Sequence, residues 1–331
     1  MLLNSTLMSK PTDHPRPPTA TDIVNVESAN AFVPIVLSGG SGMLGSALRQ
    51  ALVTEKTPIL QLVRHAPRSP EQLRWNPEID RSFENPAPLE GASAAIHLSG
   101  ASIAGHRWTE AYRRELTASR VDSTRRLATV LAQLRKPPGT LLVASAVGIY
   151  GDRGEEILDE SSRPGSGFLA DVCRKWEDAA APAVQAGIRV AHLRFGVVLG
   201  AGHGALQQML PPFRLGLGAR LGHGRQWMSW IGLDDAVAAV LFALRQTDLA
   251  GPVNVTAPNP VTNAEFTRAL AAQIGKPAFL SVPAFALRLT FGMMADEALL
   301  ASARAMPAKL LSSGFHFSTP LVNEALKNAL V

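Results

Sequence analysis

Residues 34–48 constrain the fold of this chain more than any other part of its sequence. They read PIVLSGGSGMLGSAL, an apolar segment that passes through a glycine cluster into an amphipathic helix. Gly40, Gly42 and Gly45 satisfy the spacing G-x-G-x-x-G, and Gly39 extends it to G-x-x-G-x-x-G. A strand, a glycine turn and a helix in this order present backbone N–H groups and the positive end of a helix dipole to a pyrophosphate. The pattern therefore predicts a dinucleotide site. Its residues are Gly39, Gly40, Ser41, Gly42, Met43, Leu44 and Gly45.

The next predicted strand, residues 57–63, indicates which dinucleotide is bound. No acid lies between Lys56 and Pro70, where an NAD-preferring site carries a carboxylate for the ribose. Arg64 and Arg68 stand there instead, and a guanidinium pairs well with the 2′-phosphate of NADP. The sequence favours NADP over NAD, although NAD binding stays open. The alternative is that both arginines are solvent-facing loop residues.

Apolar strands and helices alternate along most of the chain. None of the strands alternates apolar with polar residues, which is typical of a parallel sheet covered on both faces. We therefore predict an α/β fold with a Rossmann-type doubly wound parallel sheet. The further predicted strands are 94–100, 140–151, 189–199 and 251–256, and the helices include 109–135, 167–186 and 236–244. Because ligands bind beyond the carboxyl ends of such strands, we expect the turn Leu98, Ser99, Gly100 and Ala101 over the cofactor.

Composition divides the chain into three parts. Residues 1–32 are rich in Pro, Thr, Ser and Asn and lack the pattern of a signal peptide, so we predict a disordered extension. Residues 33–256 form the predicted Rossmann domain, with a proline-rich irregular connection at 69–91. The Gly-rich segment 200–230 could cover a pocket or be an irregular connection. Residues 257–331 predict a small, mostly helical domain on the substrate side.

Composition and charge also exclude several classes of protein. The 331 residues are 46% hydrophobic and 18% charged, as in a globular chain. The net charge is +5, but no run of five basic residues occurs, which favours a solvated basic surface over nucleic-acid binding. No apolar stretch approaches ~18 residues, so we expect no membrane span. A single cysteine, Cys173, excludes internal disulfides and cysteine-based zinc sites and fits a cytoplasmic protein. We predict no metal.

Three polar residues have simple structural explanations. His97 lies within an apolar strand and is expected to pack there rather than bind a ligand. Cys173 lies in the predicted helix 167–186 and is expected to be partly buried. Asp234 precedes the helix at 236–244, and an acid at that place is expected to cap it.

Several motifs in order resemble a known family. Leu-Ser-Gly-Ala at 98–101, Ser-Ala-Val-Gly-Ile-Tyr-Gly at 145–151 and Leu-Arg-Phe-Gly at 193–196 follow the glycine loop in this order. This order makes the chain similar to extended short-chain dehydrogenase/reductases. More narrowly, it resembles their atypical branch of NAD(P)-dependent epimerase/dehydratase-like proteins, which share the motifs Ser119-Arg120-x-x-x-Thr124-Arg125 and Trp230 to Asp235. Residues 307–317 match the small C-terminal domain of that branch, and the resemblance covers about residues 33–330.

The chain departs from the wider superfamily at the catalytic pair Tyr-x-x-x-Lys. The fourth residue after Tyr112 is Leu116 and the fourth after Tyr150 is Gly154, and the chain has no other tyrosine. A lysine beside the tyrosine lowers the pKa of its hydroxyl for proton exchange, so this chemistry needs substitutes.

The resemblance nevertheless implies roles for three residues. Ser145 matches the serine that hydrogen-bonds the substrate oxygen, and Tyr150 lies on the same strand-end loop, where the tyrosine of such proteins is often structural. We predict these two as the catalytic residues. Lys175 is expected beside the cofactor, or else on a solvated helix face.

Two functions from different classes remain open. The first is an NADP-dependent oxidoreductase or epimerase-like enzyme that acts on a small carbonyl or sugar-like molecule, with hydride transfer as the chemistry of the cofactor. The second is an NADP-binding regulatory or interaction protein with little catalysis. The helix at 109–135 could pair with a second copy to make a homodimer, or be covered by the sheet of its own chain.

Overall fold

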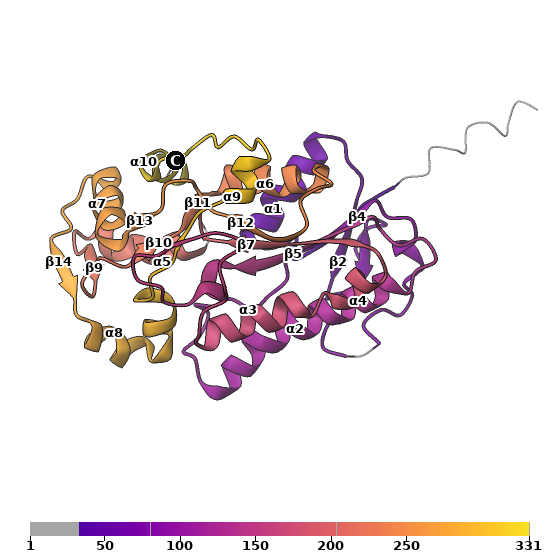
Figure 1. Cartoon of the computed structure of the whole chain (residues 1–331), viewed down its shortest axis with the longest axis horizontal. Coiled ribbons are helices and arrows are strands. Elements are labelled where there is room, and N and C mark those ends of the chain that lie inside the picture. Colours follow the sequence, from indigo (N-terminus) through magenta and orange to yellow (C-terminus); the bar gives the residue numbers. More distant parts are fainter. Residues whose placement is uncertain (1–32, 80, 203, 331) are drawn as a thin grey trace, which may run out of the picture. The chain divides into compact units, whose positions relative to one another are not determined.

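The computed structural model describes residues 33–79, 81–202 and 204–330, so the predicted extension at 1–32 lies outside the described residues. Within them, the main sheet has seven parallel strands in the order β3-β2-β1-β4-β5-β7-β12 (Figure 1). The order reverses between β1 and β4, which is where ligands bind in open α/β sheets. The predicted Rossmann-type sheet is confirmed. The strands are β1 Ile35–Ser38, β2 Ile59–Val63, β3 Gln72–Arg74, β4 Ala94–His97, β5 Thr140–Ala146, β7 Arg189–Phe195 and β12 Gly251–Val255.

Helices cover both faces of this sheet (Figure 1). Val36 of β1 packs into the core on one face, and its neighbours Ile35 and Leu37 pack into the core on the other. Because successive strand residues point to opposite faces, burial on both sides makes the strand continuously apolar. One face is covered by α2 Glu110–Ala132, α3 Phe168–Asp178 and α4 Ala181–Gln185, and the other by α1 Met43–Thr54, α6 Leu233–Arg245 and α9 Ala308–Ser312.

Two expectations about the strands were wrong. The proline-rich segment 69–91, expected to be irregular, contributes β3 to the edge of the sheet. The strand expected at 189–199 is divided at Gly196, after which β8 Val197–Leu199 pairs with β11 Trp230–Gly232. A Cβ atom at Gly196 would lie 2.6 Å from the carbonyl oxygen of Ser229. The chain therefore leaves the main sheet where a glycine allows a second backbone to approach.

The Gly-rich segment 200–230 is neither wholly irregular nor separate from the C-terminal region. It contains α5 Gly204–Arg214, β9 Ala219–Leu221 and β10 Trp227–Met228. Residues of α5, β8 and β11 share one apolar core with α7 Asn263–Ile274 and α10 Val322–Ala329. The C-terminal region is not purely helical, because β14 Leu280–Val282 pairs with β9, and β15 Arg304–Ala305 pairs with β6 Ile157–Leu158. The remaining elements are β13 Val261–Thr262, α8 Ala284–Phe291 and the short helices η1 Ala87–Leu89, η2 Val147–Tyr150 and η3 Ala295–Leu299.

Residues 230–235 join the C-terminal region to the sheet through side-chain hydrogen bonds. The indole N–H of Trp230 donates to the carbonyl of Asn259 at 3.0 Å. The carboxylate of Asp235 is buried and accepts hydrogen bonds from the backbone and hydroxyl groups of Ser318 and Thr319. The expectation that Asp234 caps α6 was wrong, because the cap residue is Gly232 and no side chain caps the helix. Asp235 is the acid with a structural role here.

None of the helices among the described residues is long and apolar enough to cross a membrane.

Candidate functional site

The glycine loop joins β1 to α1, and its glycines have different neighbours. Gly39 has a φ of +75°, and a Cβ atom there would lie 2.7 Å from the carbonyl carbon of Leu98. A Cβ atom at Gly45 would collide with the carbonyl oxygen of Gly39. At Gly42, by contrast, it would meet only that oxygen, at the ordinary distance of 3.5 Å. Packing therefore requires Gly39 and Gly45, whereas Gly42 is open on its outer side.

The start of α1 is free to receive an anion. No side chain caps this helix and its first turn contains no acid, so the first N–H groups lack a partner within the helix. The Met43 sulfur lies next to Gly200, and Leu44 packs against the core. Because these side chains pack into the protein, the two residues present only their backbone to the loop. Ser41 and Gly42 are exposed. Unpaired N–H groups and a positive helix end suit a pyrophosphate, so these residues fit a dinucleotide.

The turn at 98–101 lies beside this loop and is held from α2. The N–H of Leu98 donates to the carbonyl of Ser38 at 3.2 Å. The hydroxyl of Ser119 accepts from the N–H of Ala101 at 3.1 Å, and Arg120 donates to the carbonyl of Ala101 at 2.9 Å. The first two residues of the Ser-Arg-x-x-x-Thr-Arg motif thus fix both backbone groups of Ala101. The structure brings the predicted residues of this turn together with Gly39.

Arg120 is itself held by an aromatic ring of α3. Its guanidinium lies 5.2 Å from the centre of the Trp176 ring, and the indole N–H donates to Thr124 at 2.9 Å. A Cβ atom at Gly100 would lie 3.3 Å from this guanidinium. The motif therefore supports the turn at 98–101.

His97 packs beneath the loop, as its place in an apolar strand predicted. Its Nδ1 lies 2.5 Å from the hydroxyl of Ser38, and its Nε2 lies 3.2 Å from that of Ser123. The ring is fully buried, and this burial lowers the pKa of His97 to about 4. The imidazole is therefore neutral at pH 7 and links β1 to α2.

The predicted cationic residues are exposed. Arg64 and Arg68 follow β2, and among the described residues neither side chain has a hydrogen-bond or ion-pair partner. Both are free to meet a phosphate. Gln61 of β2 lies against Gly40 of the glycine loop, so β2 and the loop are in contact. Lys175 is exposed on α3, and no contact of the described residues joins it to the glycine loop, so its role stays a prediction.

A second group of polar side chains lies at the carboxyl ends of β5, β7 and β12. Ser145, Arg194 and Asn254 are register partners on these three adjacent strands. Arg194 forms a double hydrogen-bonded ion pair with Glu177 of α3, at 2.8 and 2.9 Å, and both side chains are largely buried. The hydroxyl of Ser145 donates to the same carboxylate at 2.7 Å. The predicted catalytic serine therefore has a carboxylate as its partner.

Tyr150 belongs to this buried group. Its ring is 0% exposed, and its hydroxyl lies 2.8 Å from the Asn254 side-chain oxygen and 2.9 Å from the Asp159 carbonyl. Arg194 donates to it at 3.0 Å. Burial raises the pKa of Tyr150 above its ordinary value. With its hydroxyl saturated by protein groups, Tyr150 holds η2 in place, and this geometry gives it no open side for a substrate.

Cys173 is buried, and its position on α3 agrees with the prediction. Burial raises the pKa of its thiol to about 12. The reactive form of a cysteine is the thiolate, so this residue is inert at neutral pH.

Sequence reasoning missed Glu177 and Arg194. The signal for Arg194 was present, because a charged residue within an apolar strand needs a buried partner. Nothing local pointed to Glu177, since it resembles any acid near the end of an amphipathic helix.

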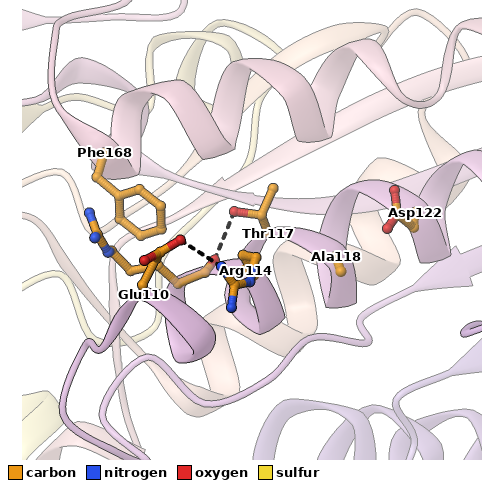
Figure 2. Close-up of a pocket in the computed structure, with 7 residues that line it drawn as sticks. Glu110, Arg114, Thr117, Ala118, Asp122 and Phe168 are labelled. Carbon is orange, nitrogen blue, oxygen red and sulfur yellow. Dashed lines mark hydrogen bonds and ion pairs between the residues drawn. The ribbon is translucent and has the colours of Figure 1, made fainter.

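One hollow, of about 440 Å³, lies along the exposed side of α2, where Arg114 pairs with Glu110 at 2.6 Å. Figure 2 shows residues that line it, Phe168 among them. Its lining includes none of the predicted cofactor or catalytic residues. Another hollow, of about 410 Å³, lies between the loops that follow β5 and the elements α8 and η3. Within the described ranges, no three His, Cys, Asp or Glu side chains gather where they could hold a metal ion.

Comparisons with known proteins agree with this architecture. Residues 35–256 match the model of the NAD dependent epimerase/dehydratase family, and residues 282–329 match a domain of unknown function (DUF1731). The epimerase family protein Mb2239 of Mycobacterium bovis is 46% identical over 298 residues, which are 90% of this chain and 97% of that protein.

Solved structures are similar as well. Human epimerase family protein SDR39U1 (isoform 2), solved with NADPH, superposes with a TM-score of 0.82 and 32% identity over 89% of this chain and 98% of that one. A nucleoside-diphosphate sugar epimerase from Corynebacterium glutamicum superposes with a TM-score of 0.71 and 36% identity over 90% of this chain and 58% of that one.

Proposed function

The chain belongs to the NAD dependent epimerase/dehydratase family, and from this premise we propose that it is an NADP(H)-dependent oxidoreductase acting on a small carbonyl or sugar-like molecule. The observation that carries the proposal is the uncapped start of α1 beside the open side of Gly42. NADP is supported by Arg64 and Arg68, whose guanidinium groups have no partner among the described residues, and by the NADPH in the human relative. The residues that would hold the cofactor are Gly39, Gly40, Ser41, Gly42, Met43, Leu44, Gly45, Arg64, Arg68, Leu98, Ser99, Gly100 and Ala101.

Ser145 and Glu177 replace the missing tyrosine and lysine in this proposal. Bound NADP(H) would supply the hydride chemistry. Because the Ser145 proton is directed at Glu177, its oxygen lone pairs are free to accept a hydrogen bond from a substrate hydroxyl. In alcohol oxidation the substrate hydroxyl would donate to the Ser145 oxygen and its proton would pass to water, and in carbonyl reduction water would return a proton. Glu177, held in place by Arg194, orients the Ser145 hydroxyl throughout.

The test begins with a fluorescence titration of the purified protein with NADPH and NADH, followed by turnover assays on a panel of carbonyl compounds and the corresponding alcohols. The Ser145→Ala variant is expected to keep its NADPH affinity and lose turnover, while Ser313→Ala, at an exposed serine, keeps both. If neither dinucleotide binds, the proposed function is wrong.

Two observations favour a second candidate, an NADP(H)-binding regulatory protein with little catalysis. The chain lacks the Tyr-x-x-x-Lys pair, and the predicted catalytic residues are buried, with Ser145 3% exposed and Tyr150 0% exposed. Tight NADPH binding without turnover of any compound in the panel would support this candidate over the enzyme.

The proposal includes a homodimer formed through α2. On its exposed side Arg114 and Asp122 lie four residues before and after Ala118. Two such helices that cross antiparallel at Ala118 would place each Arg114 opposite Asp122 of the second copy. Sedimentation velocity of the wild type and of Ala118→Arg tests this pairing, with Ala272→Arg on α7 as the control. A cytoplasmic location is also proposed, because the one cysteine fits a reducing compartment.

A further inference from the structure

The cleft between the sheet and the C-terminal region has a distinct charge. It begins at Gly151 and Asp152, which follow η2 directly and so extend from the carboxyl end of β5. Its far wall comes from α8 and η3. The charged groups that line it are Asp152, Asp296, Glu297 and Arg288, and the exposed side chain of His223 lines it as well. The three carboxylates and one guanidinium sum to a net charge of −2, in a chain whose net charge is +5.

Glu297 already occupies the place where an anion would bind. Its two carboxylate oxygens accept the N–H groups of Phe168 and Leu169, each at 3.0 Å, at the start of α3. Gly167 makes this contact feasible, because its φ is +112° and a Cβ atom there would lie 2.6 Å from a Glu297 oxygen. The N-terminus of α3 is therefore neutralised by the protein's own carboxylate and is closed to a phosphate.

The one arginine of the cleft is neutralised too. The Nε group of Arg288 donates to both carboxylate oxygens of Asp296, at 2.9 and 3.2 Å. Asp152 accepts through one oxygen from the N–H groups of Ser302 and Gly154, at 3.1 and 3.3 Å, which leaves its second oxygen without a bond among the described residues. The cleft thus offers more carboxylate acceptors than cations, and its one arginine already shares an ion pair with Asp296.

We propose that this cleft binds the substrate and selects an uncharged, hydroxyl-rich molecule, and that it rejects nucleoside diphosphate sugars. The inference rests on the proposed function and specifies its substrate class. Hydroxyl groups donate to carboxylate oxygens, whereas a diphosphate would lose its hydration beside a net negative charge whose one arginine is already paired with Asp296. The nucleoside-diphosphate sugar named for the Corynebacterium glutamicum relative is therefore not expected to bind here.

The experiment uses the NADPH-loaded protein, so that the cofactor site is filled. Calorimetric titrations with uridine diphosphate measure anion binding, and titrations with free hexoses and sugar alcohols measure binding of neutral polyols. The wild type is expected to bind at least one polyol, and to bind uridine diphosphate measurably but more weakly than that polyol. Uridine diphosphate binding as tight as that of the best polyol, or failure of every polyol, overturns the proposal.

A charge variant makes the test specific to this cleft. Asp296→Asn frees Arg288 and is expected to tighten uridine diphosphate binding by about tenfold. The reason is that Arg288 can then pair with a phosphate, and the Asp296 carboxylate no longer repels it. The matched control Asp171→Asn frees Arg174 on α3 outside the cleft and is expected to change nothing. Equal affinities in both variants overturn the proposal. NADPH affinity is measured first for each protein, so a failure of the proposed function appears as a missing cofactor site.

Discussion

Two regions at the carboxyl edge of the same sheet are built in opposite ways. At β1, β2 and β4 the site is made of backbone, because Gly39 and Gly45 remove side chains and α1 begins without a cap. At β5, β7 and β12 it is made of side chains, since Ser145, Glu177 and Arg194 fill the space and satisfy one another. The first region has unpaired backbone groups toward a ligand, and in the second the side chains already have partners within the protein.

The difference shows how each region depends on the rest of the molecule. A backbone site survives most changes elsewhere but fails when a single methyl group is added at an open glycine. A buried ion pair depends instead on both of its side chains, because removing either partner leaves an uncompensated charge in the interior. The following predictions separate these two kinds of dependence.

The largest effect is expected for Arg194→Met, which removes the cation between Glu177 and Tyr150. It should lower the free energy of unfolding by about 3–5 kcal/mol, the range for breaking a buried ion pair from one side. Urea unfolding followed by circular dichroism measures this loss. In the control Arg174→Met an exposed pair with Asp171 is broken instead, and a change of about 0.5 kcal/mol or less is expected. Similar losses in the two variants would mean that the buried network does not stabilise the fold.

The next effect concerns His97 beneath the glycine loop. Its pKa of about 4 in the folded protein lies below the ordinary 6.5, so between these pH values only the unfolded chain binds the proton. Stability should therefore fall as the pH is lowered from 6.5 to 4, by about 3 kcal/mol in total. Urea unfolding at pH 7, 5.5 and 4 measures the slope. The slope should shrink in His97→Asn and stay unchanged in His106→Asn, at an exposed histidine; an unchanged slope in both would show that His97 is not its source.

Gly42→Ala tests the open side of the loop. The new methyl group fits the protein but would meet the pyrophosphate, so NADPH affinity should fall about 100-fold, or ~2.7 kcal/mol, while the melting temperature is unchanged. Fluorescence titration and thermal unfolding of the same sample measure both. Gly45→Ala is the contrast, because its methyl group collides with Gly39 and should lower stability as well. Wild-type NADPH affinity in Gly42→Ala would contradict the site.

The smallest effect is expected for Arg64→Ala. Loss of a contact with the 2′-phosphate should weaken NADPH by about tenfold and leave NADH nearly unchanged. Arg268→Ala, an exposed arginine on α7, controls for the general loss of positive charge. Equal losses for the two cofactors would remove Arg64 from the site.

Much of the fold could be predicted from local sequence patterns. The strand, turn and helix at 34–48, the alternation that follows and the packing of His97 could be predicted because neighbouring residues determine them. The strand β3 could not be predicted in this way. Prolines lie on both sides of it, which is typical of a loop, and the segment is a strand only because it pairs with β2. Asp234 and Asp235 are equally suited to cap a helix by type, and only the position of Ser318 and Thr319 distinguishes them.

The sequence by itself determined the glycine loop on the cofactor side, because the positions of its glycines decide where backbone N–H groups are exposed. Only the tertiary structure decided the chemistry at β5. It buried the Tyr150 hydroxyl against Asn254, 104 residues away, and gave Ser145 a carboxylate 32 residues away as its partner. It also neutralised the start of α3 with Glu297, 129 residues from Phe168. Hydrogen bonds between side chains depend on distances of a few ångströms, and across such separations these distances are fixed only when the chain is packed.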